Sequence, residues 1–492
     1  MGRLFGLDPP PARASRVLEL GCGDGGNALS IAAALPDAEV LGVDASAAAI
    51  ERGSKIASAA GIENVRLRCA TFESLTDEVG TFDYIVSHGV YSWVLPVARG
   101  ALLDCVKRSM SAKGIAFVSY NAYPGSYLRD MARDILGYHV RDIEDPQRKL
   151  AAAQELMQTI VAIEEPSPFA RVLREHMERM LSYSDALLFH DDLAEVSTPF
   201  YFHEFVAHAT RHGLRFLSEA ELSESRMRDL PDSAGRLIAG LPDDVVAREQ
   251  YLDFFKNRMF RQTLVCHAEI PLDHALRDRE IERLWVSSSA RPQQEESDPQ
   301  QSDGRAREDA DADGIAGDGG EAAVERAGQT FATPEGFTVT SSEPLVLAAL
   351  NALADCWPAA LSFGELLDCA VERSGVDVSR GIALGRLRAV LLEAYLARIV
   401  QLLGCASPVA ARASERPLAS PLARAQQAAG LPALSSLLHA NVRLEGELEP
   451  RLLPLLDGTR DGAELAHALG VSREQVAESL ARLASLGLLA LG

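Results

Sequence analysis

A glycine-rich stretch near the start of the chain has the residue types and spacing of a nucleoside-binding turn. Segment 19–26, with the sequence ELGCGDGG, follows a short apolar run and opens an alanine-rich helical pattern. Glycines permit a tight turn and let the backbone approach a ligand closely. Asp44 ends the next apolar run, where a carboxylate can accept both hydroxyls of a ribose. Together these residues predict a binding site for a nucleoside cofactor.

The acidic residues of this turn distinguish between two kinds of cofactor. Gly21 and Gly23 form a dinucleotide-binding pattern with Gly26 and a methyltransferase pattern with Gly25. The two carboxylates of segment 19–26 would repel a pyrophosphate. They would attract S-adenosylmethionine, which has no phosphate and carries a sulfonium and an ammonium. The turn therefore favours S-adenosylmethionine. A nicotinamide cofactor and a purely structural strand–helix turn are the alternatives.

Two later segments gather aromatic and polar side chains, although the chain is only 6% aromatic. They follow the fourth and fifth predicted strands, where ligands bind in parallel sheets. The candidates are His88, Tyr91, Trp93, Tyr120, Asn121 and Tyr123. We interpret Tyr91 and Tyr123 as walls that align a methyl acceptor, and Asn121 as a hydrogen-bond partner that orients it. His88 would be a general base. The alternative is that His88 packs under the cofactor and Trp93 is part of the core.

The elements that must position these residues alternate between strand and helix. Short apolar runs predict strands at 16–20, 39–44, 65–69, 82–87 and 115–120, and helical patterns cover 27–35 and 46–60. This alternation predicts βαβ units and a parallel, doubly wound sheet. Residues 126–196 are helical in pattern, and a helix at 205–212 is followed by possible strands at 214–217 and 260–267. We therefore expect a helical insertion that interrupts the sheet before later strands complete it.

Composition excludes several classes of protein. The 492 residues are 47% hydrophobic and 24% charged, which is ordinary for a folded protein of several domains. The net charge of -22 disfavours general nucleic-acid binding, because phosphates would be repelled. No apolar run reaches the roughly 18 residues of a membrane span, and the N-terminal residues lack a signal-peptide pattern. The seven cysteines form no CxxC pair, which disfavours disulfides and zinc. We expect a cytoplasmic protein.

At this point the sequence resembles the class I S-adenosylmethionine-dependent methyltransferases, over residues 14–120 and onward to 270. The resemblance implies that Gly21, Gly23 and Gly25 lie along the methionine part of the cofactor, that Glu19 lies near the same part, and that Asp44 holds the ribose. Thr71 stands where the family usually has an aspartate that contacts the adenine amine. The complete implied cofactor site is Glu19, Gly21, Cys22, Gly23, Gly25, Asp44, Ala45, Ala70, Thr71 and Ser87.

Four further segments resemble those of bacterial methyltransferases that carry a regulatory domain. They are residues 88–94, 119–125, 201–205 and 416–422. That group includes protein-lysine methyltransferases that act on bacterial outer-membrane proteins, so the resemblance implies a protein lysine as methyl acceptor. Only residues 1–15 precede the first strand, fewer than in such relatives, and residues 3–7 resemble the end of their leading helix. Two alternatives follow: the start codon is misplaced, or a lid over the cofactor is missing.

The sequence divides into five predicted regions. These are a Rossmann-like cofactor-binding core at 1–125, a helical insertion at 126–198, a regulatory region at 199–285 that completes the sheet, a disordered acidic linker at 286–330, and a helical domain at 331–492. The linker is rich in polar and acidic residues and has few aliphatic residues to bury. The last region shows two similar helical stretches, 345–403 and 451–491, which are typical of winged-helix modules.

The partners expected from these patterns are proteins. The last winged-helix-like module balances arginines against acids, whereas a DNA-recognition helix needs a basic footprint. We therefore expect protein docking or self-association, with a homodimer implied by resemblance. His203 and His208 lack the spacing of a metal-binding motif, so no metal is expected. Two other functions remain open: methylation of a small molecule, and a cofactor-binding scaffold without catalysis.

Overall fold

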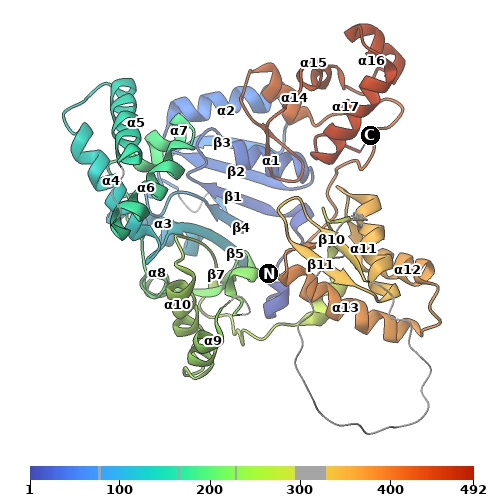
Figure 1. The fold of residues 1–492 in the computed structure, drawn as a ribbon, viewed down its shortest axis with the longest axis horizontal. Helices are drawn as coiled ribbons and strands as arrows, with labels where there is room; N and C mark the ends of the chain where they lie inside the picture. The colour runs from blue at the N-terminus through green and yellow to red at the C-terminus, as the bar shows by residue number, and fades with distance from the viewer. Residues whose placement is uncertain (76–78, 164–166, 228–229, 294–327, 492) are drawn as a thin grey trace, which may run out of the picture. The chain divides into compact units, whose positions relative to one another are not determined.

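The largest sheet of the computed structural model is a mixed seven-stranded sheet (Figure 1). The structure describes residues 1–75, 79–163, 167–227, 230–293 and 328–491. The strand order is β3-β2-β1-β4-β5-β7-β6. The strands are β1 (Arg16–Leu20), β2 (Glu39–Asp44), β3 (Val65–Cys69), β4 (Phe82–Ser87), β5 (Met110–Asn121), β6 (Leu214–Glu219) and β7 (Phe260–His267). The predicted Rossmann-like sheet, completed by strands after a helical insertion, is confirmed.

The polarity of one strand differs from the prediction of a parallel sheet. Strands β1 to β5 pair in parallel, but β7 is antiparallel to both of its neighbours, β5 and β6. The apolar run that forms β7 carries no information about its direction. Only its pairing in the folded chain shows that β7 runs against the rest of the sheet.

Helices connect the parallel strands and place the first turn motif. α1 (Gly26–Ala34) and α2 (Ala47–Ala60) pack against β2 and β3. Ser46 caps the N-terminus of α2, and its side chain accepts a hydrogen bond from the amide of Ala49. Gly61, with φ +65°, caps the C-terminus. These are standard caps for the two ends of a helix. The carboxyl ends of β1 and β2 lie side by side because the two strands pair in parallel, with Leu20 opposite Val43.

The first unit of the fold contains the sheet, the insertion and the C-terminal segment. It comprises Met1–Glu280 and Ser407–Gly492, and the second unit comprises Ile281–Ala406. Besides α1 and α2, its helices before residue 281 are α3 (Pro96–Ser109), α4 (Ser126–Val140), α5 (Pro146–Ala162), α6 (Pro168–Leu181), α7 (Asp185–Leu187), α8 (Phe202–Arg211), α9 (Asp232–Ala239) and α10 (Val245–Lys256). Helices α4 to α6 share their own apolar core, in agreement with a helical insertion.

The C-terminal segment of the first unit has winged-helix character. It contains α14 (Pro421–Ala428), β14 (Leu434–Ser435), β15 (Asn441–Val442), α15 (Glu449–Leu452), α16 (Gly462–Leu469) and α17 (Arg473–Ser485). Helix α14 contacts α2 of the Rossmann-like core, and Figure 1 shows the two side by side. Asp461 and Ser472 cap α16 and α17 through capping boxes.

The second unit is a separate small fold. It contains β8 (Trp285–Ser287), β9 (Arg291–Pro292), β10 (Gln329–Ala332), β11 (Thr338–Ser341), α11 (Pro344–Cys356), β12 (Leu361–Ser362), α12 (Phe363–Ser374), α13 (Arg380–Leu396) and β13 (Gln401–Leu403). Strands β12 and β13 flank β8 in a three-stranded sheet. Most of the predicted acidic linker, residues 294–327, lies outside the described residues. Within the described ranges, no helix is long and apolar enough to cross a membrane.

Candidate active site

The glycine turn connects β1 to α1 in a conformation that needs glycine. Gly21 has φ +75° and Gly25 has φ +78°, a region that side chains with a Cβ rarely adopt. A Cβ on Gly21 would also collide with Val90. Cys22 is buried beneath this turn. The backbone of segment 19–26 is therefore left bare on the side where a ligand could approach.

Asp44 ties the end of β2 to this turn. Its Oδ2 accepts a hydrogen bond from the amide of Gly23 at 2.8 Å, and its Oδ1 accepts one from the amide of Ser46 at 2.8 Å. Each carboxylate oxygen can accept a further hydrogen bond. Ala45 follows Asp44 and is exposed. The structure therefore brings Asp44 and the glycine turn together, with an oriented acceptor at the carboxyl end of the sheet.

Glu19 is a buried carboxylate with one oxygen available. Its side chain is 4% exposed, and its Oε1 accepts a hydrogen bond from Nδ2 of Asn27 at 3.0 Å. Among the described residues, none forms a hydrogen bond with Oε2. Burial raises the pKa of the Glu19 carboxyl to about 7, and the nearby Asp24 and Asp44 add to this effect. Such a group is stabilised in its charged form by a cation and repels a phosphate, so it fits the ammonium-bearing end of S-adenosylmethionine.

The residues after β3 lie next to Asp44, at the carboxyl ends of the parallel strands. The amide of Ala70 donates to the carbonyl of Asp44 at 2.9 Å. The amide of Thr71 donates to Oγ of Ser74 at 3.0 Å, while Thr71 itself is exposed. Ser87 ends β4, is fully buried, and has an Oγ without a hydrogen-bond partner among the described residues. The predicted cofactor residues therefore share one edge of the sheet.

His88 follows Ser87 and faces the ends of β5 and β7. Its ring centroid lies 5.9 Å from that of Phe117 and 6.0 Å from that of Phe260. Its Nδ1 lies 3.2 Å from Oγ of Ser119, a hydroxyl that also accepts a hydrogen bond from the amide of Gly89. His88 stays accessible to solvent, but burial of part of its ring lowers its pKa, so the imidazole is neutral at pH 7.

Tyr91 lies in the core, away from the group formed around His88. It is 0% exposed, and its hydroxyl oxygen lies 2.6 Å from Nδ1 of His208. Nε2 of His208 lies 3.2 Å from Nε2 of His212, whose Nδ1 lies 2.6 Å from Oδ1 of Asp104. One set of neutral tautomers satisfies this whole chain of hydrogen bonds. The structure therefore joins the buried Tyr91 to a relay that ends at the exposed Asp104, and leaves the Tyr91 side chain no surface to offer a ligand.

Asn121 and Tyr123 lie at the end of β5. Asn121 is 5% exposed, and its backbone N–H donates a hydrogen bond to Oγ of Ser92 at 2.9 Å. Tyr123 stacks on Tyr127 with ring centroids 4.2 Å apart, and its hydroxyl donates to Oδ2 of Asp130 at 2.7 Å. Burial and this carboxylate raise the pKa of Tyr123 above its ordinary value. Tyr123 thus belongs to a tyrosine cluster, and the hydroxyl of Tyr123 already has a strong hydrogen-bond acceptor.

A cavity of about 640 Å³ runs from the glycine turn past His88. It is lined by Asp24, Gly26, Asn27, Ser30, Ile31, Val86, His88, Phe117, Ser435, His439, Ala440 and Asn441. Asn27 was not among the predicted site residues, although its position at the start of the helix after the glycine turn was a usable signal. Nothing in the local sequence around residues 435–441 could have placed them beside α1, because they are about 400 residues away.

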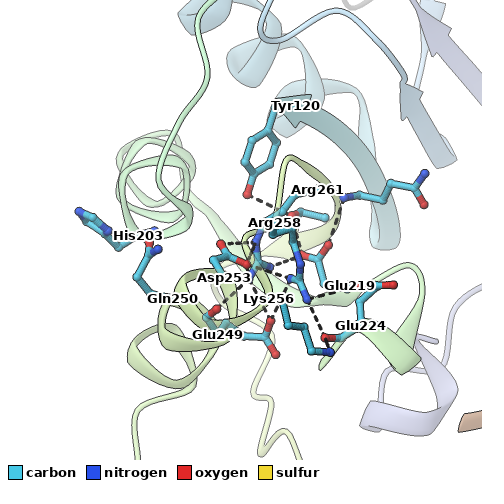
Figure 2. Close-up of polar contacts among 12 residues, drawn as sticks. Tyr120, His203, Glu219, Glu224, Glu249, Gln250, Asp253, Lys256, Arg258 and Arg261 are labelled. Atoms are coloured by element: carbon cyan, nitrogen blue, oxygen red, sulfur yellow. Dashed lines mark hydrogen bonds and ion pairs between the residues drawn. The ribbon is translucent and has the colours of Figure 1, made fainter. Parts of the chain in front are cut away.

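The regulatory region contains a buried charge cluster that supports β7 (Figure 2). Arg261 on β7 is 1% exposed and forms ion pairs with Glu219 at 2.7 Å, Asp253 at 2.8 Å and Glu249 at 3.1 Å. Although burial opposes its charge, these carboxylates raise the pKa of Arg261 well above its ordinary value. Burial also raises the pKa of Asp253, to about 6. The cluster fixes β7, and hence Phe260, beside His88.

The sheet order, the glycine turn and the carboxylate after β2 define a class I methyltransferase fold. Three family descriptions match: "Methyltransferase domain" at residues 17–114, "Predicted methyltransferase regulatory domain" at 184–267, and "PKMT, C-terminal winged helix domain" at 415–484. The chain belongs to the class I S-adenosylmethionine-dependent methyltransferases that carry this regulatory domain and this winged helix.

Solved and curated relatives agree with this family. The structure of PKMT2 from Rickettsia typhi in complex with AdoHcy is 26% identical, with a TM-score of 0.83, and the match covers 99% of this chain and 96% of that one. Two uncharacterized proteins of Rickettsia prowazekii are also similar. RP028 is 37% identical over 219 residues, which are 44% of this chain and 88% of that protein. RP789 is 32% identical over 295 residues, which are 60% of this chain, and the chain spans only 53% of that protein.

Proposed function

We propose that this chain transfers the methyl group of S-adenosylmethionine to lysine side chains of a protein. The observation that carries the proposal is Glu19, a buried carboxylate whose free Oε2 lies beside the glycine turn. This arrangement suits a cofactor that carries positive charge and no phosphate. The similarity to PKMT2 over 99% of the chain supports a lysine as the acceptor.

The residues proposed to hold the cofactor are those gathered at the sheet edge. Gly21, Gly23 and Gly25 would let the backbone approach its methionine part, Glu19 would pair with its ammonium, and Asp44 would accept the ribose hydroxyls. Cys22, Ala45, Ala70, Thr71 and Ser87 would complete the walls of the site. When bound, S-adenosylmethionine supplies a methyl group on a positively charged sulfur.

The residues proposed to handle the acceptor keep it neutral and aligned. A lysine amine has an ordinary pKa of about 10.4 and must lose a proton before it can attack. His88 is neutral at pH 7 because its pKa is lowered, so it can accept a proton from the acceptor. Asn121 would orient the acceptor, and Tyr123 would line its approach. Tyr91 is 0% exposed, so it would act from the core, through its packing on Phe200 and Phe205.

Calorimetric titration with AdoHcy tests the cofactor part of this proposal. We expect micromolar binding by the full chain and at least about tenfold weaker binding by Asp44→Ala, which loses an oriented acceptor. Asp37→Ala is the matched control, because Asp37 is an exposed residue paired with Arg13, and it should bind as the parent does. Equal binding by all three proteins would contradict the site.

Transfer of a labelled methyl group to lysine-containing proteins tests the acceptor. We expect label on lysine, detected by mass spectrometry of peptides, and none with Asp44→Ala. Label found only on small molecules would contradict the lysine assignment. Cofactor binding with no transfer to any acceptor would point to a scaffold.

A protein partner is more compatible with the winged helix than nucleic acid is. In α17, Nε of Arg482 is 2.6 Å from Oε1 of Glu449, so this arginine is engaged within the domain. Arg473 is accompanied by Glu474 and Glu478 on the same helix, which leaves little basic surface for phosphate. We also propose a homodimer, which light scattering of the purified chain would detect as twice the monomer mass.

A further inference from the structure

The cavity beside His88 has one wall from the C-terminal winged helix. Residues 436–440 connect β14 to β15, and Ser435, His439, Ala440 and Asn441 of this hairpin line the cavity. The remaining walls come from the glycine turn, α1 and the ends of β4 and β5. Both parts belong to the first compact unit. Sequence segments about 400 residues apart therefore enclose one space next to the candidate cofactor residues.

The hairpin loop is held in a defined conformation. Oγ of Ser436 accepts hydrogen bonds from the amides of Leu438 and Ala440, both at 3.2 Å. His439 adopts φ +59°, an uncommon conformation for a residue other than glycine. Its Nδ1 lies 3.1 Å from Oγ of Ser30 on α1. The loop is thus shaped to place His439 against the helix that follows the glycine turn.

The chemistry of the cavity suits a long aliphatic side chain with a cationic end. Of the twelve residues that line it in the described chain, Asp24 is the only one with a full charge at neutral pH. Ile31, Val86 and Phe117 supply apolar wall near His88, and Phe260 packs on the His88 ring from the next strand. A lysine stem can bury its methylenes against such surface while its ammonium is attracted by the carboxylate.

The tyrosine cluster is a poorer entrance for the same side chain. The hydroxyl of Tyr123 is already bonded to Asp130, and its ring is stacked on Tyr127. Tyr127 is in turn within hydrogen-bonding distance of Tyr201, at 3.0 Å between hydroxyl oxygens. An incoming lysine would have to break these contacts, whereas the cavity is open space.

We propose that the lysine acceptor enters through this cavity, as part of an extended protein segment, and that loop 436–440 selects it. This inference rests on the proposed function and assigns the substrate path within the same site. We take the segment to be extended because its lysine has to enter a space that the hairpin and α1 line together. The winged helix is thereby a specificity-determining part of the active site.

Binding of a fluorescent, unstructured peptide of alternating serine and lysine to the full chain, with AdoHcy present, tests this path. Ala440→Trp places a large ring at the wall, and we expect about tenfold or more loss of peptide affinity, because an overfilled space excludes the side chain. Ala468→Trp is the matched control, since Ala468 is an exposed residue of α16 in the same domain. Equal peptide affinity in the two variants would overturn the proposal.

A second variant, with a smaller change, tests the same wall in case Ala440→Trp misfolds. His439→Ala removes the contact with Ser30, and we expect about threefold or more loss of peptide affinity. His467→Ala, at an exposed position on α16, should bind the peptide as the parent does. AdoHcy affinity should stay unchanged in all four variants, which shows that the cofactor site is intact. An unaltered affinity in His439→Ala as well as Ala440→Trp would exclude the hairpin as a selecting wall.

The peptide measurements separate this inference from the proposed function. An otherwise identical arginine peptide should bind the parent more weakly than the lysine peptide, although both carry the same charge. Failure of the parent to bind the lysine peptide, or equal binding of both peptides, would overturn the inference. Peptide binding that depends on residues 439 and 440 without any methyl transfer would support the inference and contradict the proposed function.

Discussion

At the scale of single residues, the carboxylates around the glycine turn have distinct tasks. Glu19 is buried, and only one of its two carboxylate oxygens has a hydrogen-bond partner among the described residues. Asp44, in contrast, is oriented by hydrogen bonds from two backbone amides. A buried acid with a raised pKa is costly to ionise without a partner. A cation at Oε2 would remove that cost. Cofactor binding and ionisation of Glu19 should therefore be linked.

The pKa of Glu19 predicts how AdoHcy binding depends on pH. In the free chain this pKa is about 7, and pairing with an ammonium should lower it in the complex. Below about pH 7 binding must then release a proton, so affinity should fall as pH falls, by up to about tenfold per pH unit. Glu19→Gln should bind more weakly at pH 8 and show a flatter profile. Calorimetry between pH 6 and pH 8 measures the AdoHcy affinity of the parent and of Glu19→Gln. An equal dependence of affinity on pH in the two proteins would contradict the linkage.

At the scale of elements, β7 depends on charges that the solvent cannot reach. Arg261 neutralises Glu219 and Asp253, both nearly or fully buried, and its guanidinium carbon lies 3.8 Å from the ring centroid of Phe202 on α8. Pairs of this kind add little net stability while complete, but removing one partner leaves buried charge uncompensated. Arg258 pairs with Asp253 at 3.1 Å as well, but Arg261 is the arginine that pairs with Glu219, so the regulatory region is joined to the sheet chiefly through Arg261.

Arg261→Ala should lower the free energy of unfolding of the first unit by about 3–5 kcal/mol. Arg13→Ala breaks an exposed pair, with side chains 74% and 55% accessible, and should cost no more than about 1 kcal/mol. Urea denaturation followed by circular dichroism compares the two variants. Similar losses for both would mean that the cluster does not hold β7 in place.

The relay from Tyr91 to Asp104 connects the turn after β4 to α8 and α3 through two imidazoles. Burial and neighbouring positive charges lower the pKa of His208 below its ordinary value. The unfolded chain then binds more protons than the folded chain between that lowered pKa and about 6.5. The stabilising contribution of neutral His208 is present above this window and is lost as pH falls through it.

Replacing His208 should therefore reduce the acid sensitivity of the fold. His208→Asn retains a polar group near Tyr91 but does not titrate. We expect its thermal midpoint to fall less than that of the parent between pH 7.5 and pH 5.5. His467→Asn, at an exposed site on α16, should match the parent at both pH values. If the thermal midpoint of His208→Asn depended on pH as that of the parent does, His208 would not contribute to the acid sensitivity of the fold.

At the scale of the whole molecule, net charge should influence acceptor binding. The chain carries a formal charge of -22, and a lysine-rich segment is cationic, so long-range attraction should raise their affinity and association rate. Salt screens such attraction over roughly 8–10 Å at 0.1–0.15 M. We expect affinity for the lysine peptide to fall severalfold between about 0.05 and 0.3 M salt. AdoHcy binding, which is local, should change much less, and an equal salt effect on both ligands would contradict this reasoning.

The sequence by itself determined the elements of the core and the cofactor class. Strand and helix runs between Arg16 and Ser87 match the structure closely, because each is encoded by local periodicity and by caps such as Ser46. The glycine turn and Asp44 were recognisable because their conformation and spacing are local properties. The confirmed family, methyltransferase fold and winged helix follow from such patterns.

Only the tertiary structure decided which of the chemically plausible side chains meet. It buried Tyr91 behind His208, bonded Tyr123 to Asp130, and reversed β7 within the sheet. It also placed His439 beside Ser30, from which it is about 400 residues away in the sequence. The physical reason is that periodicity specifies which face of an element is buried. It does not specify what is packed against that face, since this depends on contacts between segments far apart in sequence.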